Sequence, residues 1–187
     1  DRFSRLHKPV GVSLQYNPTL NYSSMRLQLY SDYEAMDYDS LIAPALDIIS
    51  EESTLKNEYG DVLTIKSSNE SVKRVLHNLF YDVLNIEFNL PSWVRQMCKY
   101  GDFYLHLQIS EKFGIYNVLP LSVYQVVREE GTDPENPSYV RFILDPNGLS
   151  QSQTYTARKS DQMALENYEV AHFRLLSDAN YLPYGRS

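Results

Sequence analysis

The hydrophobic period of this chain changes from that of a helix to that of a strand at Gly101, and this change fixes the class of fold that the sequence can form. The apolar residues of segment 70–84 recur at helical spacing on one face: Val72, Val75, Leu76, Leu79, Phe80, Val83 and Leu84. After Gly101 apolar and polar residues alternate over 103–109, as in a half-buried strand. Helices followed by strands predict an α+β fold, with N-terminal helices packed on a mostly antiparallel sheet.

Capping and helix-breaking residues place the boundaries of the predicted helices. Asn69 is a good N-cap for the helix over 70–84. Pro44 is expected to start an earlier helix that ends near Lys56, and a short strand is expected over 62–66. Pro91 is expected to open the last helix, which ends at Gly101.

The rest of the chain predicts a meander of strands with an unpatterned start. The strand at 103–109 is followed by four more, the first of which pairs with it in a hairpin: 113–119, 124–130, 139–144 and 168–176. The polar stretch 149–166 is expected to carry weak structure. Residues 1–30 show no lasting period and predict an extended arm, either wrapped on a neighbour or held by its own domain.

Composition excludes several classes of protein. The net charge of −7 argues against a high-affinity nucleic-acid module, which needs a basic stripe to displace counterions from phosphates. Sixteen tyrosines suit half-buried faces and subunit contacts. The single cysteine, Cys98, rules out an internal disulfide and lies in an apolar helical pattern, where a buried, inert thiol is expected. No apolar run reaches membrane-spanning length.

No motif of known chemistry is present, so neither a cofactor nor a metal site is expected. The glycines form no phosphate-binding loop, and the histidines at 7, 77, 106 and 172 lack the spacing of a zinc site. Five acidic residues gather between 37 and 52: Asp37, Asp39, Asp47, Glu51 and Glu52. They do not have the spacing of an EF-hand loop, and a solvated helix face explains them better than a cation site or a pair of hydrolytic carboxylates.

Four groups of segments, taken in order, resemble the portal protein of tailed bacteriophages of the T4-like myovirus type. The first group is 38–53, and the second is 72–84 together with 86–88. The third is 93–106, in which a helix ends at Tyr-Gly-Asp, together with 114–128. The fourth is 172–175 together with 184–187. The similarity extends over about residues 32–187. Residues 131–166 and the first thirty do not follow the family pattern, so no contacts can be transferred to them.

The resemblance implies a structural protein and not an enzyme. Such a subunit belongs to a dodecameric ring at one vertex of the virion capsid, which nucleates head assembly in the host cytoplasm. The ring contacts the major capsid protein, docks the packaging terminase, passes DNA without sequence-specific binding, and joins the neck and tail. By this resemblance residues 31–187 are a wing-like domain that ends before the stem helices, and residues 1–30 are its N-terminal arm.

The residues expected to matter are therefore structural. The predicted core residues are Leu76, Leu79, Phe80, Trp93 and Met97, and the candidate interface residues are Arg174, Tyr184 and Arg186. The last sixteen residues have the pattern of a strand, a turn and the opening of a helix at Pro183, and this helix is expected to continue past Ser187.

Two alternatives remain open at the level of sequence. A monomeric adaptor could bind another protein through its edge strands. A small hydrolase could use the carboxylates of 37–52 with a divalent metal ion.

Overall fold

The computed structural model describes residues 18–130, 135–136, 138–145, 162–175 and 184–185, with side chains from Met25 onward. Its helices are α1 (Pro18–Met36), α2 (Ile42–Ser53), α3 (Glu70–His77), the π-helical turn η2 (Asn78–Val83) and α4 (Ile86–Tyr100). Its strands are β1 (Asp102–Ser110), β2 (Gly114–Leu121), β3 (Val126–Glu130), β4 (Val140–Leu144), β5 (Met163–Glu166) and β6 (Val170–Arg174). Helices first and strands after confirm the predicted α+β class.

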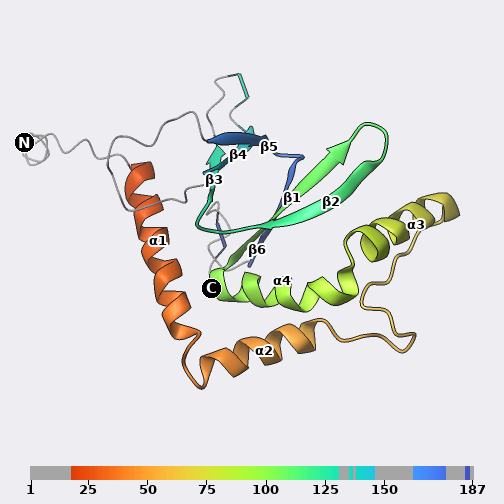
Figure 1. Cartoon of the computed structure of the whole chain (residues 1–187), viewed down its shortest axis with the longest axis horizontal. Coiled ribbons are helices and arrows are strands. Elements are labelled where there is room, and N and C mark those ends of the chain that lie inside the picture. The colour runs from red at the N-terminus through yellow and green to blue at the C-terminus, as the bar shows by residue number, and fades with distance from the viewer. Residues whose placement is uncertain (1–17, 131–134, 137, 146–161, 176–183, 186–187) are drawn as a thin grey trace, which may run out of the picture.

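The strands form two antiparallel sheets instead of one. The first sheet has the order β2-β1-β6 and the second has the order β3-β4-β5. In Figure 1, α1 and α2 meet at an elbow, α2 runs alongside α4, and α3 projects on the side away from that elbow. The N-terminal helices therefore frame the sheets.

Helix α1 occupies residues that were predicted to be extended. Residues 18–30 belong to this helix, so that part of the predicted arm is wrong, while residues 1–17 lie outside the described part of the chain. The buried face of α1 is built from Arg26, Tyr30 and Tyr33, which lie one and two turns apart. These side chains bury their apolar parts and keep polar ends, so a search for hydrophobic residues does not find the face.

The predicted features from Pro44 to Gly101 are partly confirmed. Helix α2 begins at Ile42, which leaves Pro44 in the first turn, where its missing N–H has no helical partner. The strand predicted at 62–66 does not form. Just before that segment, the Asn57 side chain accepts hydrogen bonds from the backbone N–H groups of Tyr59 and Asp61 and closes a turn over residues 57–61.

The helix predicted over 70–84 begins as expected and then widens. The Asn69 side chain caps α3 by accepting hydrogen bonds from the N–H groups of Ser71 and Val72, as predicted. From Asn78 the helix continues as the π-helical turn η2, and the Leu84 N–H reaches back five residues to the Leu79 carbonyl at 2.9 Å.

Helix α4 is longer than predicted. It begins at Ile86, so Pro91 lies inside the helix and the prediction that Pro91 opens it was wrong. Its C-terminus is confirmed, because Gly101 adopts a φ of 78° and donates its N–H to the Met97 carbonyl at 2.8 Å. Strand β1 follows this cap at once.

Strand β1 is buried on both faces at its start, although the sequence predicts a half-buried strand. Phe103, Tyr104 and Leu105 are all buried. The ring centroids of Phe103 and of Trp93 in α4 are 5.9 Å apart. On the other face, the ring centroids of Tyr104 and of Phe142 in the second sheet are 6.1 Å apart. The helix covers one face and the second sheet covers the other.

The remaining strands agree well with the sequence. The hairpin of β1 and β2 is confirmed, with Gly114 at a φ of 68° beginning β2. Strands β3, β4 and β6 lie inside the predicted segments 124–130, 139–144 and 168–176. Strand β5 lies in the stretch expected to carry weak structure, and it pairs with β4.

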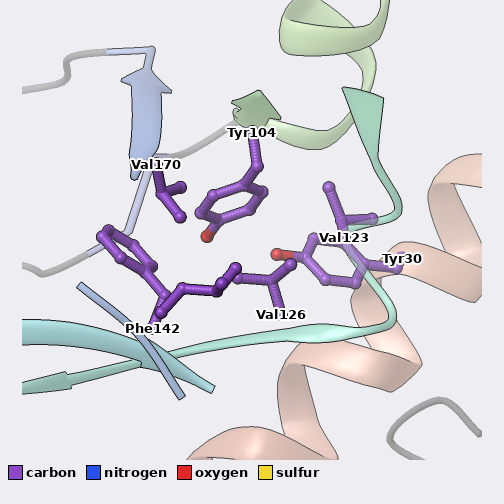
Figure 2. Packing of buried hydrophobic residues seen from close by; sticks show 7 residues of the cluster. Tyr30, Tyr104, Val123, Val126, Phe142 and Val170 are labelled. Atoms are coloured by element: carbon purple, nitrogen blue, oxygen red, sulfur yellow. The ribbon is translucent and has the colours of Figure 1, made fainter. Parts of the chain in front are cut away.

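The main hydrophobic core lies between the two sheets and is joined by one residue of α1 (Figure 2). Its buried members are Tyr30, Tyr104, Val123, Val126, Phe142, Leu165 and Val170. None of the five core residues predicted from the sequence belongs to this cluster. Leu76, Leu79, Phe80, Trp93 and Met97 are all half-buried.

Candidate functional site

The most buried charged side chain in the described part of the chain is that of Asp102, the first residue of β1. Its side chain is 1 % exposed. Oxygen Oδ1 accepts a hydrogen bond from the Gly185 N–H at 2.8 Å and lies 2.8 Å from His172 Nε2. Oxygen Oδ2 accepts a long bond of 3.4 Å from the Tyr30 hydroxyl and lies 3.9 Å from the Arg26 guanidinium. A buried charge is tolerated only when it is compensated in this way.

His172 connects Asp102 to a second arginine. Its Nδ1 lies 3.2 Å from Nη1 of Arg128 in β3. Because a guanidinium can only donate, Nδ1 is the acceptor, and the proton on Nε2 is donated to Asp102. Burial lowers the pKa of His172 and outweighs the opposing effect of Asp102. The imidazole is therefore neutral, and its two hydrogen bonds connect Asp102 in the first sheet to Arg128 in the second.

Tyr184 completes this junction within the chain. It is 8 % exposed, and its ring lies 3.2 Å below the Arg26 guanidinium carbon. Its hydroxyl accepts a hydrogen bond from the Arg128 N–H at 3.0 Å and donates one to the Arg128 carbonyl at 3.2 Å. Tyr184 was predicted as an interface residue, and in the described structure its contacts are internal.

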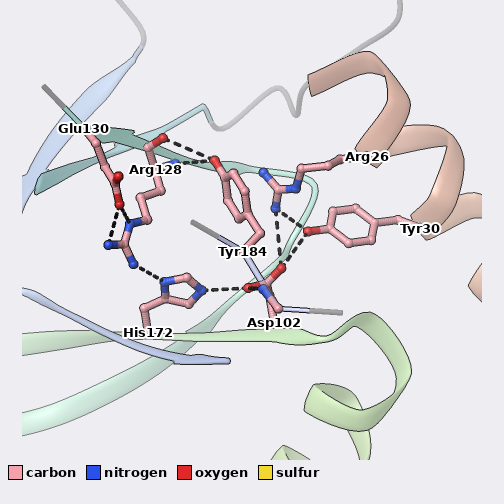
Figure 3. A network of polar contacts seen from close by, with 8 residues as sticks. Arg26, Tyr30, Asp102, Arg128, Glu130, His172 and Tyr184 are labelled. Atoms are coloured by element: carbon pink, nitrogen blue, oxygen red, sulfur yellow. Dashed lines mark hydrogen bonds and ion pairs between the residues drawn. The ribbon is translucent and has the colours of Figure 1, made fainter. Parts of the chain in front are cut away.

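Gly185 is held closely against the start of β1. A Cβ on this residue would lie 1.8 Å from the Gly101 carbonyl oxygen, so only glycine fits. Figure 3 shows the resulting network, in which Asp102 and its partners join α1, β1, β3, β6 and the segment at 184–185. We call this set of Arg26, Tyr30, Asp102, Arg128, His172, Tyr184 and Gly185 the Asp102 junction.

A second polar cluster ties the helices together. Asp37, just after α1, receives two hydrogen bonds from Arg95 of α4, at 2.7 and 3.2 Å, and one from Lys99 at 2.9 Å. The same guanidinium bonds Asp47 of α2 through Nε at 2.5 Å. Hydrogen bonds from Arg95 and Lys99 lower the pKa of Asp37 to about 2.

The acidic residues of 37–52 therefore have several separate roles. Asp37 and Asp47 pair with Arg95, and Asp39 accepts the Leu41 N–H at 2.8 Å at the start of α2. Glu51 and Glu52 are exposed on α2. Within the described ranges, no group of three or more histidine, cysteine or acidic side chains is arranged to hold a metal ion.

The remaining predicted site residues lie apart from the Asp102 junction. Trp93 and Met97 line a small apolar cavity of about 80 Å³ between α4 and the first sheet, together with Phe103 and Phe173. Leu76 lies on α3, and Leu79 and Phe80 lie on η2. Arg174 is half-buried at the end of β6, and Arg186 lies outside the described residues.

Sequence reasoning missed the Asp102 junction because its members are far apart in the chain. The alternation of β6 predicts that His172 shares one strand face with every second residue, but no local pattern predicts that Asp102 faces it. The only local signal was the Tyr-Gly-Asp sequence, which places an acid directly after a helix C-cap.

Comparison with protein families gives one clear result. A family model described as bacteriophage T4-like portal protein (Gp20) matches residues 26–183. The match begins at Arg26 and extends through His172, so it covers both polar clusters apart from the residues at 184–185. A search of curated proteins found no match. Among the helices of the described ranges, none has the length and apolarity needed to cross a membrane.

Because the match covers most of its length, this chain belongs to the bacteriophage T4-like portal protein family.

Proposed function

We propose that the chain is the wing-like part of a portal subunit and that it acts as a structural component of a dodecameric ring. The observation that carries the proposal is the family match over residues 26–183. In this role the subunit is not an enzyme and uses no cofactor. The ring lies at the capsid vertex of the virion, after assembly in the host cytoplasm.

The distribution of polar and apolar groups supports an assembly role. The Asp102 junction and the Asp37 cluster are paired by hydrogen bonds within the described part of the chain, so they stabilise the fold. Large apolar side chains remain exposed on three helices, among them Met36 on α1, Ile48 on α2 and Val75 on α3. Exposed apolar surface of this extent is typical of proteins that bind other proteins.

The proposed partners follow from the family. In addition to neighbouring subunits, the ring contacts the major capsid protein, the terminase and the neck proteins, and it serves head assembly, packaging, ejection and tail attachment. DNA passes through it without sequence-specific binding, and the net charge of −7 disfavours adhesion of the phosphate backbone. Arg174 and Arg186 remain proposed contacts between subunits or domains.

The test is the particle formed by the full-length subunit. Negative-stain imaging and mass photometry are expected to show closed rings with a central hole. A stable monomer over the whole accessible concentration range would contradict the proposal and would favour the adaptor alternative.

A further inference from the structure

The elbow between α1 and α2 carries apolar side chains with an acidic border. Met36, Leu41 and Ile42 are 48 %, 80 % and 39 % exposed. An open hollow between the two helices is lined by Asp32, Ala35, Met36, Asp39 and Ile42. We call Asp32, Met36, Asp39, Leu41 and Ile42 the elbow surface. Asp32 and Asp39 make the border of this hollow acidic, whereas Asp37 beside it is paired with Arg95 and Lys99 of α4.

Helix α3 presents the opposite combination of side chains. It packs mainly against η2, and Val72 and Val75 are 46 % and 67 % exposed. Val72 and Val75 lie on one face of the helix, and the exposed Lys73 and Arg74 flank that face on its two sides; the acidic residue of the helix, Glu70, lies at its first position. We call Val72, Lys73, Arg74 and Val75 the α3 surface, which is apolar and carries two positive charges.

The positions of the two surfaces favour contact between different copies. In Figure 1 α2 and α4 extend between the elbow and α3, so a chain does not bring its own α3 to its own elbow. A symmetric contact of elbow with elbow would bring the acidic borders of Asp32 and Asp39 together, which is unfavourable. Contact between two different patches instead gives a head-to-tail arrangement, which can close into a ring.

We propose that the α3 surface of one copy docks on the elbow surface of the next copy. This inference rests on the proposed ring function and adds the pair of surfaces that join the subunits. Apolar contact between the valines and the residues Met36, Leu41 and Ile42 supplies the buried area. Attraction between Lys73 or Arg74 and Asp32 sets the orientation.

The first test is site-specific cross-linking in the full-length subunit, with Cys98→Ser and with any further native cysteine also replaced by serine. Two single-cysteine variants, Ile42→Cys and Val75→Cys, are mixed before assembly and treated with a short bis-maleimide. The expected product is a covalent dimer that contains one chain of each kind. A matched control pairs Ile42→Cys with Tyr168→Cys, an exposed residue of the turn before β6, and is expected to yield no such dimer.

The second test is charge reversal with rescue. The double variant Lys73→Glu with Arg74→Glu is expected to lower the yield of rings about tenfold, and adding Asp32→Lys is expected to restore most of it. Asp39 is left unchanged because it accepts N–H groups at the start of α2. Lys112→Glu, an exposed change in the β1–β2 hairpin, is the control and is expected to leave the yield unchanged.

The outcomes separate this inference from the proposed function. If the unmodified subunit forms no rings, the proposed function itself fails. If rings form but charge reversal and the cross-linking pair both have no effect, the docking proposal fails and the ring remains. If the thiol introduced at Ile42 becomes protected in the ring without cross-linking to the one at Val75, another segment or virion protein occupies the elbow, and the proposal is again overturned.

Discussion

The Asp102 junction buries polar groups, whereas the α2–α3 helical region leaves apolar groups exposed. Around Asp102, charged and aromatic groups are buried and paired with one another inside the chain. On α2 and α3, apolar side chains such as Ile48 and Val75 stay exposed, at 59 % and 67 %. The buried, paired groups of the junction stabilise the fold, whereas the exposed apolar side chains of the helical region are available to contact other proteins.

The largest expected loss of stability comes from removing the buried carboxylate of Asp102. Asp102→Ala leaves the buried Arg26 charge without its ion-pair partner and the His172 N–H without its acceptor, so the free energy of unfolding is expected to fall by about 3–5 kcal/mol. Urea denaturation followed by circular dichroism measures it. Glu52→Ala, an exposed change on α2, is the control and is expected to stay within about 0.5 kcal/mol. A loss below about 1 kcal/mol for Asp102→Ala would contradict the role of the junction.

The second expected effect concerns the hydrophobic core. Phe142 is 3 % exposed between the sheets, and Phe142→Ala is expected to cost about 3 kcal/mol or more. Phe80 is half-buried on η2, so Phe80→Ala is expected to cost clearly less in the isolated chain. Equal losses in urea denaturation would show that η2 belongs to the same core as the sheets.

The third expected effect is a dependence of stability on pH with two separate windows. The pKa of His172 is lowered in the folded state, so its stabilisation is fully present above its ordinary value of 6.5 and is lost progressively as the pH falls below that value towards the lower pKa of the folded state. The pKa of Asp37 is lowered from 3.8 to about 2, so its stabilisation is lost between about pH 4 and pH 2.

Substitutions assign each window to its residue. His172→Gln is expected to flatten the stability curve between pH 7 and pH 5 and to leave the more acidic window unchanged. Asp37→Asn is expected to cost about 1 kcal/mol at neutral pH and nothing near pH 2, a modest value because the cluster is in part reached by solvent. A curve that stays flat from pH 7 to pH 5 in the unmodified chain would contradict the neutral, buried state of His172.

A smaller effect distinguishes two buried hydroxyl groups. The Tyr104 hydroxyl has no hydrogen-bond partner among the described residues, so Tyr104→Phe is expected to be neutral or to stabilise by up to about 1 kcal/mol. The Tyr184 hydroxyl has two bonds to the Arg128 backbone, and Tyr184→Phe is expected to cost about 1 kcal/mol. Thermal unfolding of the two variants measures the difference. A larger loss of stability for Tyr104→Phe than for Tyr184→Phe would contradict the assigned hydrogen bonds.

The smallest effect on stability is expected in the helical region. Ile48→Ser and Val75→Ser change exposed side chains and are expected to alter the free energy of unfolding by no more than about 0.5 kcal/mol. Losses of 2 kcal/mol or more would show that these residues support the fold, which would remove the contrast between the two regions.

Features with a local chemical cause could be predicted from the sequence. Asn69 caps α3 and Gly101 ends α4 because each acts on backbone groups within a few residues. The β1–β2 hairpin follows from alternation on either side of a turn that ends at Gly114. The order of helices and strands followed from such signals, and it fixed the fold class.

Features that depend on distant partners could not be predicted. The buried face of α1 is made of Arg26 and Tyr30, which become core residues only because Asp102 and Tyr184 lie beside them. Phe80 and Trp93 have the pattern of core residues, yet both are only half-buried in the described structure. Strand β5 forms because it can pair its backbone groups with the edge of β4.

Hydrogen–deuterium exchange can be compared between the unassembled full-length subunit and its assembled form. This comparison tests directly whether the elbow and α3 are assembly surfaces while the Asp102 junction is internal to each subunit. The account predicts that peptides from the elbow and α3 gain protection on assembly, whereas peptides of β1 and β6 around Asp102 and His172 are already protected in the monomer and change little. Equal exchange at the elbow and α3 in both states, together with new protection at β1 and β6, would contradict the account.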